Sequence, residues 1–382
     1  MVSAFASARV GVRGVAGARI QGLDMLRGVA ILLVMLRHSF PEVFGGAGIV
    51  GVVMFFALSG YLITAILHRD IVERGRVSYG RFYRNRALRL FPALVFVVAG
   101  IVVATLVFDP LGDRGVLGRT VLVALSYTGN LPFDHGGGAI GHLWTLATEE
   151  QFYLVWPLLL VLGVRWRRLR VVVALAGVAI MAACVVTLVV AAPSYWLVYT
   201  YPASWAVAMV IGAAGFLGRD RVARVLPRAG SGASSPAALG VGVLAVAVLL
   251  ILSFVPELKN FALAYVVAGP VIAVVTVVLI NYVRHWRVLP SAALRPLLWL
   301  GVISYAAYLW NFPISLWLLG AGYWVHAIGT IVLTVVAAGV SLVVVERPFQ
   351  RLKARLEARA RQSEVGAVVD ELSSPSSSSS SA

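Results

Sequence analysis

Two adjacent glutamates interrupt an apolar part of the sequence. Glu149 and Glu150 lie seven and eight residues after His142, within GHLWTLATEEQFYLVWPLLL. On a helix this spacing places them about 10–12 Å along the axis from His142. A carboxylate at such a depth needs a partner or takes up a proton. Proton transfer is therefore a candidate role for either glutamate, with a structural polar contact as the alternative.

An imidazole forms the second candidate. The stretch LDMLRGVAILLVMLRH carries Asp24 and Arg27 near its start and His38 at its end. Arg27 and His38 are eleven residues apart, or about three helical turns, so they share one face and lie ~16 Å apart. Asp24 shares that face, three residues before Arg27. If this stretch is a helix that crosses a membrane, we expect the Asp24–Arg27 pair at its cytoplasmic end. The imidazole of His38 then lies near the middle of the membrane and can act as a general base. A purely structural polar ladder is the alternative.

Paired arginines open a third apolar stretch, YGRFYRNRALRLFPAL. Arg86 and Arg89 have i,i+3 spacing and share a helical face. Two guanidinium groups at a membrane boundary suit a ligand rich in phosphate. The alternative is that these arginines only set the topology.

The elements that carry these residues are membrane helices. The chain of 382 residues is 60% hydrophobic and only 13% charged, with a mean hydropathy of +0.91. Apolar runs near the ~20 residues that cross a bilayer recur along it, which predicts an all-α polytopic membrane protein. The shorter segment 116–131 is expected to be re-entrant or interfacial. The ten runs are 25–44, 48–67, 88–108, 143–163, 171–191, 203–218, 237–255, 261–282, 297–319 and 324–345.

The charge distribution predicts the orientation. With ten crossings and the N-terminus inside, 28 of the 32 Lys and Arg residues lie inside. Both termini are then cytoplasmic and 109–142 is outside. This topology accounts for the net charge of +16, so we expect no nucleic-acid partner. The single cysteine, Cys184, excludes an intrachain disulfide, and no residues have the spacing of metal ligands.

Three regions are expected along the chain. Residues 1–19 form a cytoplasmic basic tail, and 20–350 form the membrane domain with a polar channel in the bundle. Residues 351–382 begin as a cytoplasmic basic helix and end as SSPSSSSSSA, a tail too polar to pack and expected to be disordered.

Six motifs in order resemble the acyltransferase-3 family of integral membrane acyltransferases, over about residues 20–350. The family's Asp-x-x-Arg with R-x10-H matches Asp24, Arg27 and His38, and its G-H-x-W-S-L-x-x-E-E-Q-F-Y matches 141–153 with Thr145 for Ser. Its late S-Y-x-x-Y-L-W-H-W-P matches 304–313, with Asn311 for His and Phe312 for Trp. The remaining matches are F-x-x-S-G at Phe56, Ser59 and Gly60, R-x-x-R at Arg86 and Arg89, and E-[KR]-P-F at Glu346 to Phe349.

The resemblance implies transfer of an acyl group, often acetyl, from acyl-CoA to a sugar hydroxyl, in a bacterial cytoplasmic membrane. The acceptor could be a surface polysaccharide, a glycolipid or a glycosylated metabolite, and acyl-CoA is a co-substrate rather than a bound cofactor. His38 would be the base or transient acyl carrier, oriented by Glu149 or alternatively Glu150. Asp24, Arg27, Arg86 and Arg89 would hold the donor. Ser59, His142, Trp144, Tyr153 and Asn311 would contact the acceptor or support the site.

Asn311 limits one part of this resemblance, because an amide cannot take the acid–base role of a histidine. The competing function is a transporter or flippase of a lipid-linked sugar or acyl group, which also carries charges near the midplane. No inverted repeat is visible in the sequence to support it. A regulatory membrane receptor is a more distant alternative.

Overall fold

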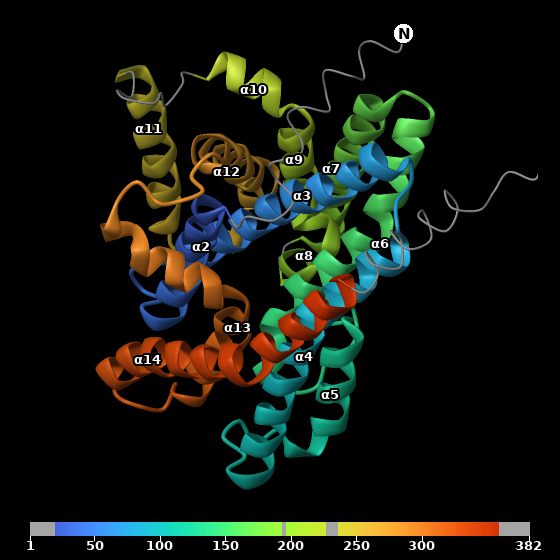
Figure 1. The fold of residues 1–382 in the computed structure, drawn as a ribbon. Coiled ribbons are helices and arrows are strands. Elements are labelled where there is room, and N and C mark those ends of the chain that lie inside the picture. The colour runs from blue at the N-terminus through green and yellow to red at the C-terminus, as the bar shows by residue number, and fades with distance from the viewer. Residues whose placement is uncertain (1–19, 193–195, 227–235, 359–382) are drawn as a thin grey trace, which may run out of the picture.

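The computed structural model describes residues 20–192, 196–226 and 236–358, and this part of the chain contains helices and no strand. The helices form one bundle in which α13 packs against α2 and α14, and α3 packs against α2 and α9 (Figure 1). The helices are α2 (Gln21–Ser39), α3 (Ala47–Arg74), α4 (Tyr79–Val107), α5 (Leu117–Ser126), α6 (Trp144–Arg165), α7 (Leu169–Ala191), α8 (Trp196–Thr200), α9 (Pro202–Leu217), α10 (Arg219–Val225), α11 (Pro236–Ser253), α12 (Gly269–Val283), α13 (Arg295–Trp317) and α14 (Tyr323–Ser341).

Short helical turns complete the fold. Two π-helical turns, Ala264–Ala268 and Leu342–Glu346, extend α12 and α14. The 3-10 turn Gly138–Leu143 leads into α6, and others lie at Arg114–Val116, Leu258–Asn260 and Ala292–Leu294.

The predicted all-α polytopic membrane protein is confirmed. Eight helices in the described part are long and apolar enough to cross a membrane. Each of the ten expected runs forms a helix, and the two outside those eight are α2 and α6. These two carry Asp24, Arg27 and the paired glutamates, so their charge separates them from the others. Polar helices of this kind usually face a bundle interior and mark a functional site.

Segment 116–131 contains only the ten-residue helix α5. Its length of about 15 Å is half of the hydrocarbon thickness, so it is too short to span. This agrees with the expected re-entrant or interfacial segment.

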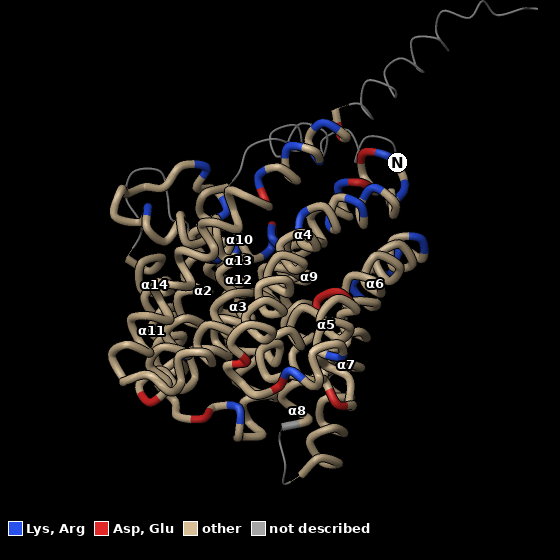
Figure 2. Tube along the Cα trace, turned by 90° about the horizontal axis from the view of Figure 1, so that it is seen from below, with Lys and Arg blue, Asp and Glu red and all other residues tan. Residues whose placement is uncertain are grey.

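Lys and Arg gather mostly toward one end of the bundle (Figure 2). At that end the last helix continues to Ala358, and Asn85 of α4 donates a hydrogen bond of 2.8 Å to Glu357. The basic helix expected from residue 351 is thus partly described and contacts α4. The expected tails 1–19 and 359–382 lie outside the described residues.

Glycines bring α2 and α13 into backbone contact beside the site. A Cβ on Gly28 would overlap the carbonyl oxygen of Leu297, and a Cβ on Gly301 would overlap that of Asp24. Gly60, next to Ser59 on α3, approaches the carbonyl oxygen of Met209 on α9 in the same way. Small residues allow such close approach between membrane helices, and here they fix the spacing of helices that carry Arg27, His38 and Ser59.

We expect Gly301→Val to lower the yield of folded protein several-fold. The added side chain must push α2 from α13, and overpacking of this kind costs ~1–3 kcal/mol or more. The measurement is the monodisperse fraction after detergent extraction. Gly339→Val on α14 is the matched control, because a Cβ there meets nothing within 4 Å. Equal yields of the two variants would contradict this packing argument.

Candidate active site

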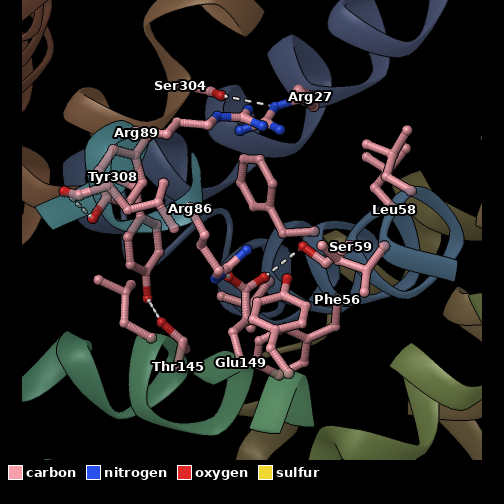
Figure 3. A pocket seen from close by; sticks show the side chains of 18 of the residues that line it. Arg27, Phe56, Leu58, Ser59, Arg86, Arg89, Thr145, Glu149, Ser304 and Tyr308 are labelled. Carbon is pink, nitrogen blue, oxygen red and sulfur yellow. Dashed lines mark hydrogen bonds and ion pairs between the residues drawn. The ribbon is translucent and has the colours of Figure 1, made fainter. Parts of the chain in front are cut away.

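A pocket lies between α2, α3, α4, α6 and α13, and its empty space including the open mouth is about 830 Å³. Figure 3 labels most of its polar lining residues, and its apolar wall comes mainly from α3. Five polar residues in this lining are Arg27, Ser59, Arg86, Arg89 and Glu149. With Ser304, Tyr305 and Tyr308 also in the lining, the pocket brings together five of the six sequence motifs.

Glu149 lies in the pocket and is held by two neighbours. The hydroxyl of Ser59 donates a hydrogen bond of 2.7 Å to its Oε1 (Figure 3). Its Oε2 is 3.8 Å from a guanidinium nitrogen of Arg86, and about a fifth (19%) of the side chain is exposed. Glu149 is therefore the carboxylate that a molecule in the pocket can reach.

Arg86 is fully engaged with protein groups. Its Nε donates to both oxygens of Glu150 at 2.9 and 3.1 Å, and one Nη lies 2.9 Å from Glu150. Its guanidinium also stacks 3.5 Å above the ring of Tyr153. Arg86 thus holds Glu150 and Tyr153 in place, and it offsets the negative charge of Glu150 beside Glu149. The expected donor-binding role of Arg86 would require breaking these contacts.

Arg27 and Arg89 lie together at the other side of the pocket (Figure 3). Arg27 donates a hydrogen bond of 3.3 Å to Ser304 on α13, and Asp24 lies one turn earlier on α2. Arg89 is exposed, and within the described residues it forms no ion pair with a carboxylate. Its guanidinium can therefore accept an anionic ligand without losing a protein partner.

His38 lies in a second polar cluster, outside the pocket lining. Its Nδ1 is 2.5 Å from Oδ1 of Asn311, and the amide nitrogen of Asn311 donates to Thr334 at 3.1 Å. The backbone carbonyl of His38 accepts a hydrogen bond of 3.0 Å from His326. His38 remains half-buried, whereas Asn311 and Thr334 are completely buried. The imidazole is thus held through its Nδ1, and its ring also packs against Phe312.

An aromatic layer separates the pocket from His38. Tyr308 lines the pocket, its hydroxyl lies 2.6 Å from Thr145, and it donates a 3.0 Å bond to the carbonyl of His142. The ring of Phe312 lies 5.3 Å from that of His38 and 5.1 Å from that of His142. We call Tyr308, His142 and Phe312 the aromatic partition. Its ring contacts form a continuous connection from the pocket lining to the imidazole of His38.

The expected contact between His38 and Glu149 or Glu150 is absent from the structure: Glu149 accepts a hydrogen bond from Ser59 and Glu150 from Arg86, while Asn311 contacts His38. The helix predicted over 25–44 also ends earlier, at Ser39, one residue after His38. The predicted common face of Arg27 and His38 is confirmed, since both contact α13, at Ser304 and Asn311.

The remaining candidate residues have mainly packing contacts. Trp144 is buried, with its ring 6.2 Å from Phe56 and 5.0 Å from Tyr199. Tyr153 is buried beneath Arg86, and His142 is buried in the aromatic partition. Within the described ranges, no group of three His, Cys, Asp or Glu side chains could hold a metal ion.

Several site residues were missed from the sequence. Tyr308 is within the matched motif but was not singled out, although it lies three residues from Asn311 and so near the same face. His326, Thr330 and Thr334 follow one another at spacing of four on α14, and all three are buried. A polar stripe at helical spacing in an apolar helix is the signal that could have identified them.

The fold and the site define a helical membrane protein with a charged pocket beside a fixed imidazole. Residues 20–345 match the sequence model of the acyltransferase domain, so the chain belongs to the acyltransferase-3 family that its motifs predicted. No solved structure gives a significant match.

Curated bacterial relatives support this membership. The chain is 29% identical over 322 residues to peptidoglycan O-acetyltransferase OatA of Listeria monocytogenes, covering 77% of this chain and 49% of that protein. It is 28% identical over 359 residues to the putative peptidoglycan O-acetyltransferase YrhL of Bacillus subtilis, covering 87% and 55%. O-acetyltransferase OatA of Staphylococcus aureus is 32% identical over 151 residues, covering 37% and 24%. The chain spans about half the length of the first two relatives.

Proposed function

We propose that this chain transfers an acyl group, most simply acetyl, from acyl-CoA to a hydroxyl of a sugar-containing acceptor. One observation carries the proposal. Within the described residues Arg89 forms no ion pair, and it lines one side of a pocket whose other side holds Glu149. Ring contacts through Tyr308, His142 and Phe312 connect this pocket with the imidazole of His38. The arginine can bind the phosphates of an acyl-CoA donor, the glutamate can protonate the departing sulfur, and the imidazole can act as the base for a hydroxyl acceptor.

The donor binds with its phosphates at Arg89 and Arg27. Guanidinium groups match phosphate oxygens in a planar fork, and among the described residues no carboxylate forms an ion pair with Arg89. The pantetheine arm then extends along the apolar wall from α3 toward Ser59 and Glu149. The arginine-rich end of the bundle is the cytoplasmic side under the positive-inside rule, which puts acyl-CoA where the cell makes it available.

The acceptor approaches His38 from the opposite side. His38 is half-buried and lies in the last turn of α2, away from the arginine-rich end. The side chains of Tyr308 and Phe312 must turn aside for the hydroxyl and the thioester to meet. The partition then also keeps water from the thioester until the acceptor is bound.

The reaction exchanges one bond for another. The acceptor oxygen attacks the thioester carbonyl carbon, its proton passes to His38, an ester C–O bond forms and the C–S bond breaks. Glu149 starts as the carboxylic acid and gives its proton to the departing sulfur, so free CoA leaves as the thiol and Glu149 is left as the carboxylate. His38 and Glu149 return to their starting states by proton exchange with water.

The acceptor class follows from the relatives' names. Two of them are named peptidoglycan O-acetyltransferases, so glycan strands of peptidoglycan are the first acceptor to test. The bacterial cytoplasmic membrane, with both termini on the cytoplasmic side, is the location that fits a cytoplasmic donor and an external acceptor.

The test uses the full chain purified into lipid nanodiscs. Acetyl-CoA labelled in its acetyl group is added with soluble peptidoglycan oligosaccharides, and labelled ester in the sugar is measured by mass spectrometry. Label that appears in the sugar and requires His38 supports the proposal. In sealed proteoliposomes, label that crosses the membrane without a change in chemical form would instead show a transporter.

We expect Arg89→Ala to raise the KM for acyl-CoA about tenfold with little change for the acceptor, because a charge-assisted hydrogen bond contributes ~1.5–3 kcal/mol. Arg86→Ala should instead lower kcat, since it releases Glu150 and removes the positive charge beside Glu149. The measurement is initial rate against each substrate. Arg84→Ala is the control, because Arg84 is an exposed arginine of the same helix outside the pocket lining. An equal KM effect of all three would mean that the arginines act only through net charge.

A further inference from the structure

The least expected residue of the site is Asn311. The family motif has a histidine at this position. From the sequence, the expected role of Asn311 was only to contact the acceptor or to support the site. In the structure its amide oxygen is 2.5 Å from Nδ1 of His38, and the residue is completely buried on α13. A short hydrogen bond from a completely buried amide is a contact to the base itself and leaves that oxygen engaged.

The amide nitrogen of Asn311 makes its second contact. Its Nδ2 donates a hydrogen bond of 3.1 Å to Oγ1 of Thr334, which is also completely buried. With the amide nitrogen turned to Thr334, only the oxygen faces His38. An amide oxygen accepts and cannot donate, so His38 must present its proton on Nδ1.

The consequence concerns the other ring nitrogen. A neutral imidazole carries one proton, so a protonated Nδ1 leaves Nε2 with a free lone pair. That is the form a general base needs. The same logic holds where a hydrogen-bond acceptor fixes the tautomer of a catalytic histidine, although here the acceptor is neutral.

Neighbouring contacts restrain the imidazole further. His326 on α14 donates to the backbone carbonyl of His38 at 3.0 Å. Helix α14 therefore holds the end of α2 directly through His326, and it holds the imidazole indirectly through Thr334 and Asn311. None of the polar stripe residues on α14 lines the pocket, and two of them, His326 and Thr334, contact His38 or its partner Asn311.

We propose that Asn311, fixed by Thr334, is the positioning residue that keeps His38 in its Nδ1–H form, in the role the sequence assigned to Glu149. This inference rests on the proposed function in that His38 is the base. Asn311 itself touches no substrate and exchanges no proton.

A pair of substitutions at Thr334 gives the first test. Thr334→Val keeps the volume but removes the hydroxyl, so the Asn311 amide can turn and the imidazole is no longer fixed. We expect kcat to fall on the order of tenfold or more, since small misplacement of a catalytic group is costly. The KM for acyl-CoA should not change, because the donor pocket does not include Thr334. Thr334→Ser restores the hydroxyl and should restore kcat.

Substitutions at Asn311 give a second test. Asn311→Leu removes both hydrogen bonds at similar volume and should lower kcat at least as far as Thr334→Val. Asn311→Asp keeps an acceptor oxygen toward Nδ1 and should retain far more activity than Asn311→Leu. If Asn311→Leu were well folded and as active as Asn311→Asp, the proposed positioning role would be wrong.

A spectroscopic readout makes the inference independent of activity. Solid-state NMR of protein with ¹⁵N-labelled histidine in nanodiscs distinguishes the two neutral tautomers, and His38→Gln identifies the His38 signal. We expect Nδ1–H in the unsubstituted chain and a mixture of tautomers in Thr334→Val. An Nε2–H form in the unsubstituted chain would overturn the inference even if transfer is observed. Absence of transfer with an Nδ1–H signal would instead count against the proposed function.

Discussion

Replacing His38 with Gln is expected to reduce acyl transfer on the order of 10²-fold or more while leaving the protein folded. A general base contributes about 10²–10⁴-fold to a rate, and an amide can hydrogen-bond but cannot take the hydroxyl proton. The change should appear in kcat and not in the KM for acyl-CoA, because His38 lies outside the pocket lining. The measurement is single-turnover transfer of labelled acetyl in nanodiscs.

The fold of the His38 variant can be checked separately. Gln can still accept or donate toward Asn311, so the buried amide need not lose its partner. Monodispersity and thermal unfolding should therefore match the unsubstituted chain. His285→Gln, in the segment between α12 and α13, is the matched control and should keep full activity. A well-folded His38→Gln protein with near-normal transfer would remove His38 from the chemistry.

The class of fold could be predicted because its cause is local. A run of about 20 apolar residues must form a helix in lipid, where each backbone polar group needs an internal partner. All ten runs therefore appear as helices, and the ten-residue α5 is too short to be an eleventh span. Helix ends were predicted less well: α2 ends at Ser39, and Phe40 leaves the helical conformation directly before Pro41, a residue pair that disfavours helix and is visible in the sequence.

The sequence predicted which residues form the site better than it predicted which residues contact one another there. The motifs identified His38, Glu149, Arg86 and Ser59, and the structure gathers three of these in one pocket. Their partners depend on how α3, α6 and α13 are rotated against one another, and that rotation follows from close contacts such as Gly60 with Met209. Spacing within one helix gives the shared face of Arg27 and His38, but it cannot show which residue of another helix meets that face.

Asn311, which stands where the family motif has a histidine, shows most clearly what could not be predicted from the sequence alone. In the sequence it reads as the loss of a histidine from a motif, which weakens a functional assignment. In the structure the same residue supplies the hydrogen bond to His38 that Glu149 was expected to supply. The amide and the carboxylate differ in charge but share an acceptor oxygen, which is the only property that fixing the tautomer requires.

The second large effect is expected from Glu149→Gln, which should lower turnover by about 10²-fold. Gln keeps a hydrogen-bonding contact with Ser59 but cannot exchange a proton with the departing sulfur. Glu150→Gln is the matched control, since Glu150 is held by Arg86 and only supports the site. It should reduce turnover much less, and folded yield should be similar for both variants.

The double substitution His38→Gln with Glu149→Gln decides whether the two residues act as one unit. Residues in one catalytic unit are strongly non-additive, and the double variant then loses little more than either single variant. The structure gives His38 and Glu149 separate partners, on opposite sides of the aromatic partition. We therefore expect the losses to multiply, to on the order of 10⁴-fold, as for sites without shared partners. A double variant no worse than His38→Gln alone would mean that the two side chains meet during the reaction, and that the partition opens far enough to bring Glu149 to the imidazole.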